Sequence, residues 1–262
     1  MSTATTSRWR AGRLEPVDDC EVAPTSVIAA DSWLVADGRA LALDLHRARF
    51  AAASGEAEDE LDAFWAAAIA AIPREGSWFP RVELRRVRER PELRLLLRPA
   101  PETRRSLVLA THRGPDPRRT PGVKGPDLER LLRLRSAAQA SGADEAVILA
   151  PDGAVVEGTT SAIAWWHGDA LAIPAPELAR VDSVTLRSVL ALATALGVDV
   201  LHERARPEEL DGHEVWALSA LHGIRIATAW VDGPSLAEQP GRLRTWRDRL
   251  AALRRPIGRE AA

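Results

Sequence analysis

A segment near the middle of the chain excludes regular secondary structure and so divides the sequence. Residues 113–125, RGPDPRRTPGVKG, contain three prolines and three glycines. Proline fixes φ and removes a backbone donor, and glycine loses the most backbone freedom on ordering, so neither a helix nor a strand is expected here. At 262 residues the chain is long enough for two domains. We predict a small N-terminal α/β domain at 1–115, a linker at 116–125 and a C-terminal domain at 126–262.

The linker holds the only lysine of the chain. Lysine and arginine together number 35, and one of them is Lys124, so the other 34 are arginine. Arginine serves wherever a positive charge is enough, whereas the lysine amine can lose its proton and attack a carbonyl. A lone lysine is therefore a candidate for amine chemistry, most commonly a Schiff base. The alternative is a surface lysine that sequence drift left behind.

The overall composition excludes several classes of protein. A net charge of −2 without any basic tract argues against binding of nucleic acid. The single cysteine, Cys20, excludes an intramolecular disulfide and a cysteine-cluster metal site. No apolar run reaches the roughly 18 to 20 residues that span a bilayer. The N-terminus also lacks the apolar core of a signal peptide, so we expect a cytoplasmic protein without membrane partners.

Apolar patterning predicts mixed elements in the N-terminal half. Asp37-Gly38 between apolar runs indicates a hairpin. Asp44 stands where an N-cap would, with a helix after it. Apolar residues recur at helical spacing over Glu58–Ile72, and Pro73 ends that helix. Three further strands are expected in this domain, at residues 78–87, 92–98 and 106–110.

The C-terminal half alternates between helices and hairpins. Pro126 is expected in the first turn of a helix that Gly142 closes. Asp152-Gly153 and residues 167–169 are expected turns of two hairpins. Ser183 is expected to cap a helix over 184–196. The remaining elements are strands at 198–203, 214–218 and 224–231, and a terminal helix at 242–253.

The order of motifs after the lone lysine resembles a known family. Lys124 precedes a helix-like run, then DEAV at 144–147, an Asp-Gly turn at 152–153, and Glu157 at the end of a strand. This order and spacing resemble the class IV aminotransferase family, the fold-type IV pyridoxal-phosphate enzymes. The resemblance extends over residues 123–231. It implies a two-domain α/β fold with a larger C-terminal pseudo-barrel domain, pyridoxal 5'-phosphate in the interdomain cleft, and a homodimer in which the partner helps to close each site.

The resemblance assigns the two central roles of the site. Lys124 would form the Schiff base with the cofactor and then move protons as a general base. Glu157 would contact the pyridine nitrogen and keep it protonated, which preserves the ring as an electron sink. A solvent-exposed glutamate at a strand end is the alternative for Glu157.

The resemblance also implies a site for the cofactor phosphate. LDLHRARF is similar to the family segment L-x-x-H-x-x-R-L, which places the phosphate arginine at Arg49, with a surface charge as the alternative. VDSVTLR resembles the family's helix start, so Val184 and Thr185 would offer donors at a helix N-terminus. Ser219 and Ala220 stand where the family has a second phosphate loop.

Three residues are implied substrate contacts, and several positions depart from the family. Arg98 stands where the family often has a carboxylate-binding arginine, with a surface arginine as the alternative. His222 and Arg225 would line the pocket, although Arg225 could equally pair with an acid outside it. The chain has no tyrosine to hold the cofactor's phenolate oxygen. Asp127 and Ala162 replace asparagines of the family.

The resemblance leaves three functions open. SALHGI at 219–224 is more similar to the N-A-L-x-P-V loop of the lyases than to the glycine-threonine loop of the transaminases. We therefore expect a 4-amino-4-deoxychorismate lyase, which releases pyruvate and 4-aminobenzoate. The alternative is a branched-chain or D-amino-acid transaminase. The third possibility is a relative that binds a ligand without turnover.

Overall fold

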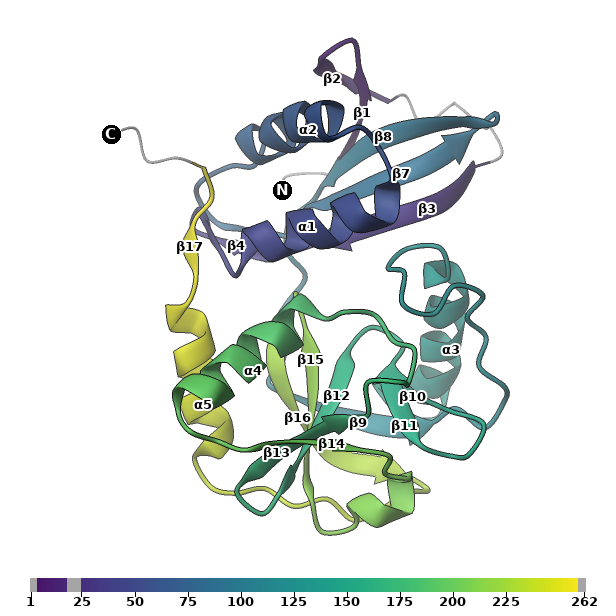
Figure 1. Cartoon of the computed structure of the whole chain (residues 1–262), viewed down its shortest axis with the longest axis vertical. Coiled ribbons are helices and arrows are strands. Elements are labelled where there is room, and N and C mark those ends of the chain that lie inside the picture. The colour runs from purple at the N-terminus through teal and green to yellow at the C-terminus, as the bar shows by residue number, and fades with distance from the viewer. Residues whose placement is uncertain (1–3, 18–24, 259–262) are drawn as a thin grey trace. The chain divides into compact units, whose positions relative to one another are not determined.

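The computed structural model describes residues 4–17 and 25–258 and divides into two compact units (Figure 1). The first unit contains the chain up to Glu102, residues 123–126, and the segment from Leu253 onward. The second unit contains residues 103–122 and 127–252. Cys20 lies outside the described residues. None of the helices in the described ranges is long and apolar enough to cross a membrane.

The first unit is built on a five-stranded antiparallel sheet in the order β2-β1-β8-β7-β3. Its strands are β1 (Thr5–Arg10), β2 (Arg13–Pro16), β3 (Thr25–Ser32), β7 (Arg81–Val87) and β8 (Arg90–Leu97). Two helices, α1 (Leu43–Ser54) and α2 (Glu58–Ala70), bury their apolar sides against one face of it. A small second sheet joins β4 (Val35–Ala36), β5 (Arg39–Ala40), β6 (Ser77–Trp78) and β17 (Arg255–Pro256).

The helix predictions for this unit are confirmed in extent but not in capping. α2 buries its predicted apolar residues and ends before Pro73. α1 begins at Leu43 after Ala42, whose φ of 44° is left-handed, so Asp44 lies in the first turn and is not the N-cap. The prediction for Asp44 was wrong because its carboxylate suits the positive end of the helix dipole as well as a cap.

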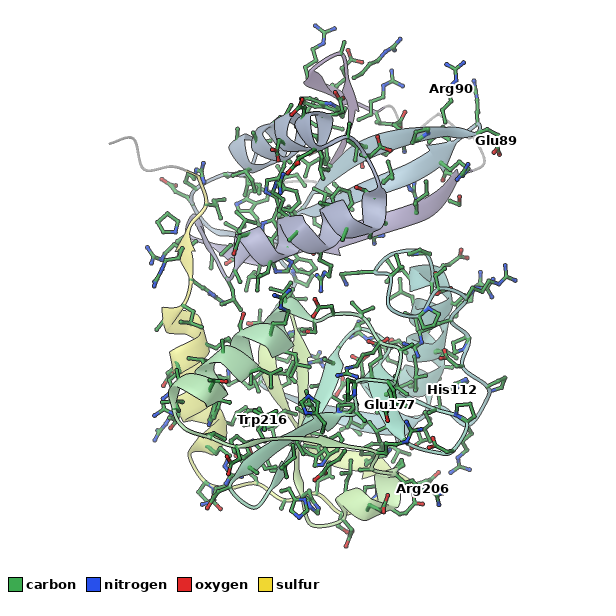
Figure 2. The ribbon with its side chains drawn as sticks, in the orientation of Figure 1. Glu89, Arg90, His112, Glu177, Arg206 and Trp216 are labelled. Carbon is green, nitrogen blue, oxygen red and sulfur yellow. The ribbon has the colours of Figure 1, made fainter. Side chains whose placement is uncertain are left out.

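The hairpin between β7 and β8 has a strained turn. Arg88 and Glu89 join the strands, and their φ values are 46° and 66°. A two-residue turn with two positive φ angles favours Asn-Gly, and each side-chain-bearing residue costs about 1–2 kcal/mol there. Glu89 and Arg90 project from the tip of this hairpin (Figure 2). The predicted hairpin at Asp37-Gly38 is confirmed, also with two positive φ angles.

The second unit is built on an eight-stranded mixed sheet in the order β11-β10-β9-β16-β15-β12-β13-β14. Its strands are β9 (Ser106–Thr111), β10 (Glu145–Leu149), β11 (Val155–Gly158), β12 (Ala162–His167), β13 (Ala170–Pro174), β14 (Val200–Glu203), β15 (Glu214–Ser219) and β16 (Gly223–Val231). Both predicted hairpins are present, as β10–β11 and β12–β13. Adjacent tryptophans on β12 point to opposite faces, and both Trp165 and Trp166 are buried, in keeping with a packing role.

Four helical elements accompany this sheet: α3 (Leu128–Ala140), α4 (Val184–Ala195), the short 3-10 helix η1 (Pro207–Leu210) and α5 (Arg242–Ala252). The cap prediction for α4 is confirmed, because the Ser183 side chain accepts a hydrogen bond from the Leu186 amide at 3.2 Å. Pro126 precedes α3 and lies outside its first turn.

β9 belongs to a different sheet from the one expected. It lies between β10 and β16, parallel to both, in the second unit. Its sequence predicts a strand, but parallel pairing with strands far along the chain leaves no local signal. The segment after Leu253 joins the first unit through β17 and β5. The division of the chain therefore differs from the ranges 1–115 and 126–262 at both ends of the second unit.

Candidate functional site

Lys124 lies in an irregular segment that β3 fixes in place. The Ala30 amide of β3 donates a hydrogen bond to the Lys124 carbonyl at 2.8 Å. Gly125 has a φ of 128°, and a Cβ there would lie 2.6 Å from the Ala30 nitrogen. Only glycine allows the backbone to approach so closely in this conformation. The lysine therefore has a defined backbone position despite the absence of regular structure around it.

A buried polar cluster lies in the same unit as Lys124. Asp31, which is 0% exposed, receives Arg49 through two hydrogen bonds of 2.8 Å (Nε–Oδ2) and 2.9 Å (Nη2–Oδ1). Nδ1 of the buried His46 lies 2.8 Å from Asp31 Oδ1. Arg47, the neighbour of Arg49 in sequence, instead pairs with the exposed Asp62. The structure thus distinguishes the predicted phosphate arginine from the surface arginine beside it.

The charges of this cluster follow from burial and pairing. Burial lowers the pKa of His46, Asp31 opposes this, and the charges of Arg49 and Lys124 lower it further. Burial raises the pKa of Asp31, but His46 and Arg49 outweigh it and hold that pKa far below its usual value. His46 is therefore neutral and donates from Nδ1 to an ionised Asp31. The charge of Lys124 is thus the smallest of the contributions that lower the pKa of His46.

Glu157 is buried at the end of β11 in the second unit. Its side chain is 7% exposed and forms an ion pair with Arg118, whose side chain is 4% exposed. The Val181 amide, in the segment that leads to α4, donates to Glu157 Oε2 at 3.2 Å. Glu157 is therefore not a solvent-exposed glutamate at a strand end, because its carboxylate is buried and has two partners.

Arg118 is a residue that the sequence patterns did not single out. Its Nη2 lies 2.7 Å from Asp116 Oδ2, so it bridges Asp116 and Glu157. Burial lowers the pKa of Arg118, but Asp116 and Glu157 raise it above its ordinary value. Burial raises the pKa of Asp116, and Arg118 outweighs this and lowers it. The only signal for this bridge is the Asp-x-Arg spacing, which is uninformative among 34 arginines.

The predicted phosphate donors of the second unit lie at a helix start and a turn. Val184 and Thr185 are buried and begin α4, where the first amides have no acceptor within the helix. Ser219 Oγ accepts from the His222 amide at 3.3 Å, which orders the turn after β15. Because Val181 contacts Glu157, the structure brings the start of α4 and Glu157 together. Helix-terminal amides of this kind suit a phosphate.

The three predicted substrate residues have different surroundings. Arg98 donates from Nε to the Phe79 carbonyl at 3.1 Å, with its guanidinium 5.1 Å from the Phe79 ring centre. Burial and the surrounding arginines lower the pKa of His222 to about 4. The neutral imidazole accepts the Arg104 amide at Nδ1, over 3.2 Å, so its proton is on Nε2.

Arg225 has a partner within the core of the second unit. It is 2% exposed, and its Nη2 lies 3.3 Å from Glu145 Oε2. Thr159 and Thr160 donate further hydrogen bonds to Glu145. This agrees with the alternative of an acid partner for Arg225.

Asp127 organises the segment before α3. Its Oδ2 accepts hydrogen bonds from the amides of Arg119 at 3.0 Å and Thr120 at 2.8 Å. Among the residues that the structure describes, no group of three or more His, Cys, Asp or Glu side chains is placed to hold a metal ion. The donor groups present instead are an amine, buried carboxylates, a buried guanidinium and helix-terminal amides, which suit an aromatic aldehyde that carries a phosphate.

Solved structures with a similar fold include aminotransferases. A hypothetical aminotransferase from Mycobacterium tuberculosis, in a form with bound pyridoxal phosphate, is 18% identical over 96% of this chain and 98% of its own, with a TM-score of 0.79. The branched-chain aminotransferase of Thermoproteus uzoniensis with norvaline is 18% identical over 97% of this chain and 100% of its own, with a TM-score of 0.80. No curated protein has a sequence that matches this chain.

The family itself is shown by sequence. The model of the amino-transferase class IV family matches residues 29–230, which is most of the chain and includes Lys124 and Glu157. The similar structures cover nearly the whole chain and confirm the predicted α/β, fold-type IV architecture. The chain therefore belongs to the class IV aminotransferase family, the fold-type IV pyridoxal-phosphate enzymes.

Proposed function

We propose that this enzyme is a pyridoxal-phosphate-dependent transaminase that acts on a small amino acid and a keto acid. The observation that carries the proposal is the only lysine, fixed on β3 beside the buried Asp31–His46–Arg49 cluster. The similar structures support transamination over the lyase reaction that the SALHGI loop favours, because they are aminotransferases, one with norvaline and another with ketoglutarate.

The residues assigned to the cofactor have different chemical tasks. Pyridoxal phosphate, when bound, supplies an electron sink for chemistry at an amino-acid carbon. Lys124 attaches it covalently and then carries a proton to and from the substrate carbon. The Glu157 carboxylate would accept a hydrogen bond from the protonated ring nitrogen and so keep that nitrogen protonated. The phosphate is bound by Arg49 and by donors at the start of α4 and the β15 turn, namely Val184, Thr185, Ser219 and Ala220.

Two groups are proposed for the substrate. Arg98 offers a guanidinium to a carboxylate, with its Nε occupied by the Phe79 carbonyl. His222 is neutral and keeps a donor at Nε2. We further propose a cytoplasmic homodimer, as the family resemblance implies. Size-exclusion chromatography with light scattering tests the dimer, and a monomer with full activity would exclude it.

A single-turnover experiment separates the two reactions. Cofactor-loaded enzyme is mixed with L-norvaline or another amino acid without any keto-acid acceptor. A transaminase releases about one keto acid per chain and then stops, because the amino group remains on the enzyme until an acceptor arrives. Continuous pyruvate release from aminodeoxychorismate, with no such stop, would instead assign the lyase reaction. Absence of both reactions in loaded enzyme would favour the non-catalytic relative.

Arg118 is proposed to position Glu157 for the ring nitrogen. Replacing it by glutamine leaves a buried carboxylate without its counter-charge, and removing one partner of a buried pair is costly. We expect R118Q to bind the cofactor about tenfold more weakly, since residues that orient a ligand-binding group contribute affinity of this order. Bound cofactor should also raise the unfolding temperature of R118Q less than that of the wild type. R118K should recover most of the binding.

The control variant for this test is R119Q, because Arg119 is exposed and adjacent in sequence. Cofactor affinity is measured by titration, and thermal unfolding is followed with and without cofactor. A purely structural role would lower the unfolding temperature of both forms equally and leave cofactor affinity unchanged. That result would remove the proposed role.

A further inference from the structure

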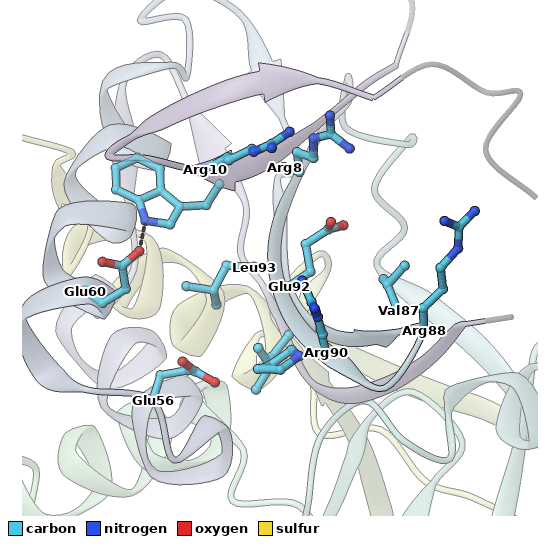
Figure 3. Close-up of a pocket in the computed structure, with 12 residues that line it drawn as sticks. Arg8, Arg10, Glu56, Glu60, Val87, Arg88, Arg90, Glu92 and Leu93 are labelled. Atoms are coloured by element: carbon cyan, nitrogen blue, oxygen red, sulfur yellow. Dashed lines mark hydrogen bonds between the residues drawn. The ribbon is translucent and has the colours of Figure 1, made fainter. Parts of the chain in front are cut away.

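A cavity of about 690 Å³ opens in the first unit where β1 separates from β8 (Figure 3). β1 pairs with β8 from Thr5 to Arg8, with Arg8 opposite Arg94. Beyond that point Trp9 and Arg10 pair with β2 alone. The edge of β8 over residues 90–93 therefore faces the cavity, and its other edge pairs with β7. Diverging strands create this space within the first unit, and none of the residues that line it is among those assigned above.

The charged residues of the cavity wall differ between its two sides. Glu56 and Glu60 come from the helical side, whereas the strands and their turn contribute four arginines and one acid, Glu92, which pairs with Arg94 (Figure 3). The floor between the two sides is apolar and consists of Trp9, Leu84 and Leu93. The Trp9 indole donates its N–H to Glu60, which fixes that carboxylate beside the ring. A ligand with two opposite charges and an apolar body matches these walls.

Three of the four arginines are available to a ligand. Within the described part of the chain, Arg10, Arg88 and Arg90 form no ion pair with a carboxylate. Neighbouring arginines of the same sheet are paired, since Arg13 lies 3.0 Å from Glu15 and Arg94 pairs with Glu92. A guanidinium without a protein partner can bind a ligand carboxylate through two hydrogen bonds.

The turn that carries these arginines is strained. Arg88 and Glu89 adopt left-handed φ values without being glycine, and Arg90 follows directly. Backbone strain of this kind persists where the surroundings require one conformation, and it is frequent at ligand sites. The strain is consistent with a turn that keeps Arg88 and Arg90 at the rim of the cavity.

We propose that this cavity is a second, non-catalytic site for a free α-amino acid with an apolar side chain. The ammonium group lies toward Glu56 and Glu60, the carboxylate toward Arg10 and Arg90, and the side chain on the Trp9 floor. The two glutamates disfavour a simple dianion, because like charges repel in a confined site. The volume falls within the range of about 300–1,000 Å³ that is typical of small-molecule sites.

The test is calorimetric titration of the full-length holoenzyme after borohydride reduction, which blocks turnover, with L-leucine as the probe. We expect binding in the wild type and an affinity lower by about tenfold or more in the double variant R10Q/R90Q, because charge-assisted hydrogen bonds to the carboxylate are lost. The R10K/R90K variant should restore part of it. R13Q, which removes a paired arginine outside the cavity, should bind as the wild type does.

Two matched probes and one variant complete the design. 4-Methylpentanoate lacks the ammonium group and 3-methylbutylamine lacks the carboxylate, so both should bind at least about tenfold more weakly than leucine. K124A should retain the leucine site, which separates it from the proposed catalytic site. Equal affinity in R10Q/R90Q and R13Q, no binding at millimolar leucine, or binding that K124A abolishes would each overturn the proposal.

Discussion

Replacement of Lys124 by alanine is expected to abolish covalent attachment of the cofactor and to lower turnover by about 10³-fold or more. The amine supplies both the attachment and the proton carrier, and loss of a general base alone commonly costs about 10²–10⁴-fold. No other lysine can substitute, since the remaining 34 basic residues are arginines. Mass spectrometry after borohydride reduction measures attachment, and steady-state kinetics measures turnover.

The matched control is K124R, which keeps the positive charge beside His46 but cannot attach to an aldehyde. It should lose attachment as completely as K124A does. The only other primary amine is the N-terminal one, so a fixed cofactor in either variant has a single possible location. Full turnover in K124A, or a cofactor found only on the N-terminal amine of the wild type, would refute the assignment.

Gly125→Ala is expected to destabilise the protein by about 3 kcal/mol and to reduce activity strongly. The added Cβ would lie 2.6 Å from the Ala30 nitrogen and 2.9 Å from the Ala29 carbonyl carbon, both of which are backbone atoms of β3. The clash and the φ of 128° each cost about 1–3 kcal/mol. Relief requires the segment to move away from β3, which would displace Lys124 as well. Denaturant unfolding and the extent of cofactor attachment measure the two effects.

Gly122→Ala is the control in the same segment. Gly122 also has a positive φ, 95°, but the nearest atom to its added Cβ is the Arg180 carbonyl oxygen at an ordinary 3.7 Å. It should show the cost of backbone strain alone, about 1–2 kcal/mol, with normal attachment. Equal losses in the two variants would mean that the close approach to β3 does not position Lys124.

Some features of the structure can be predicted from neighbouring residues in the sequence, and others cannot. The turn at Asp37-Gly38 and the Ser183 cap follow from neighbouring residues in sequence, and both appear as predicted. The helix predicted over Glu58–Ile72 also appears, and it ends at Ala70. The Arg118–Glu157 pair joins residues 39 positions apart. The Arg225–Glu145 pair joins residues 80 positions apart. No sequence motif predicts either ion pair, because the two partners of each pair come together only when the chain has folded.

Residue type and order were enough to predict the family, the fold class and the uniqueness of Lys124. Composition marked the amine, and the resemblance to the class IV aminotransferase family marked Glu157. Only the tertiary structure decided which arginine is buried, that Asp31 pairs with Arg49, and that β9 lies in the second unit's sheet. The physical reason is that burial and charge pairing are properties of groups brought together across long stretches of chain. In a sequence with 34 arginines, only such contacts distinguish one guanidinium from another.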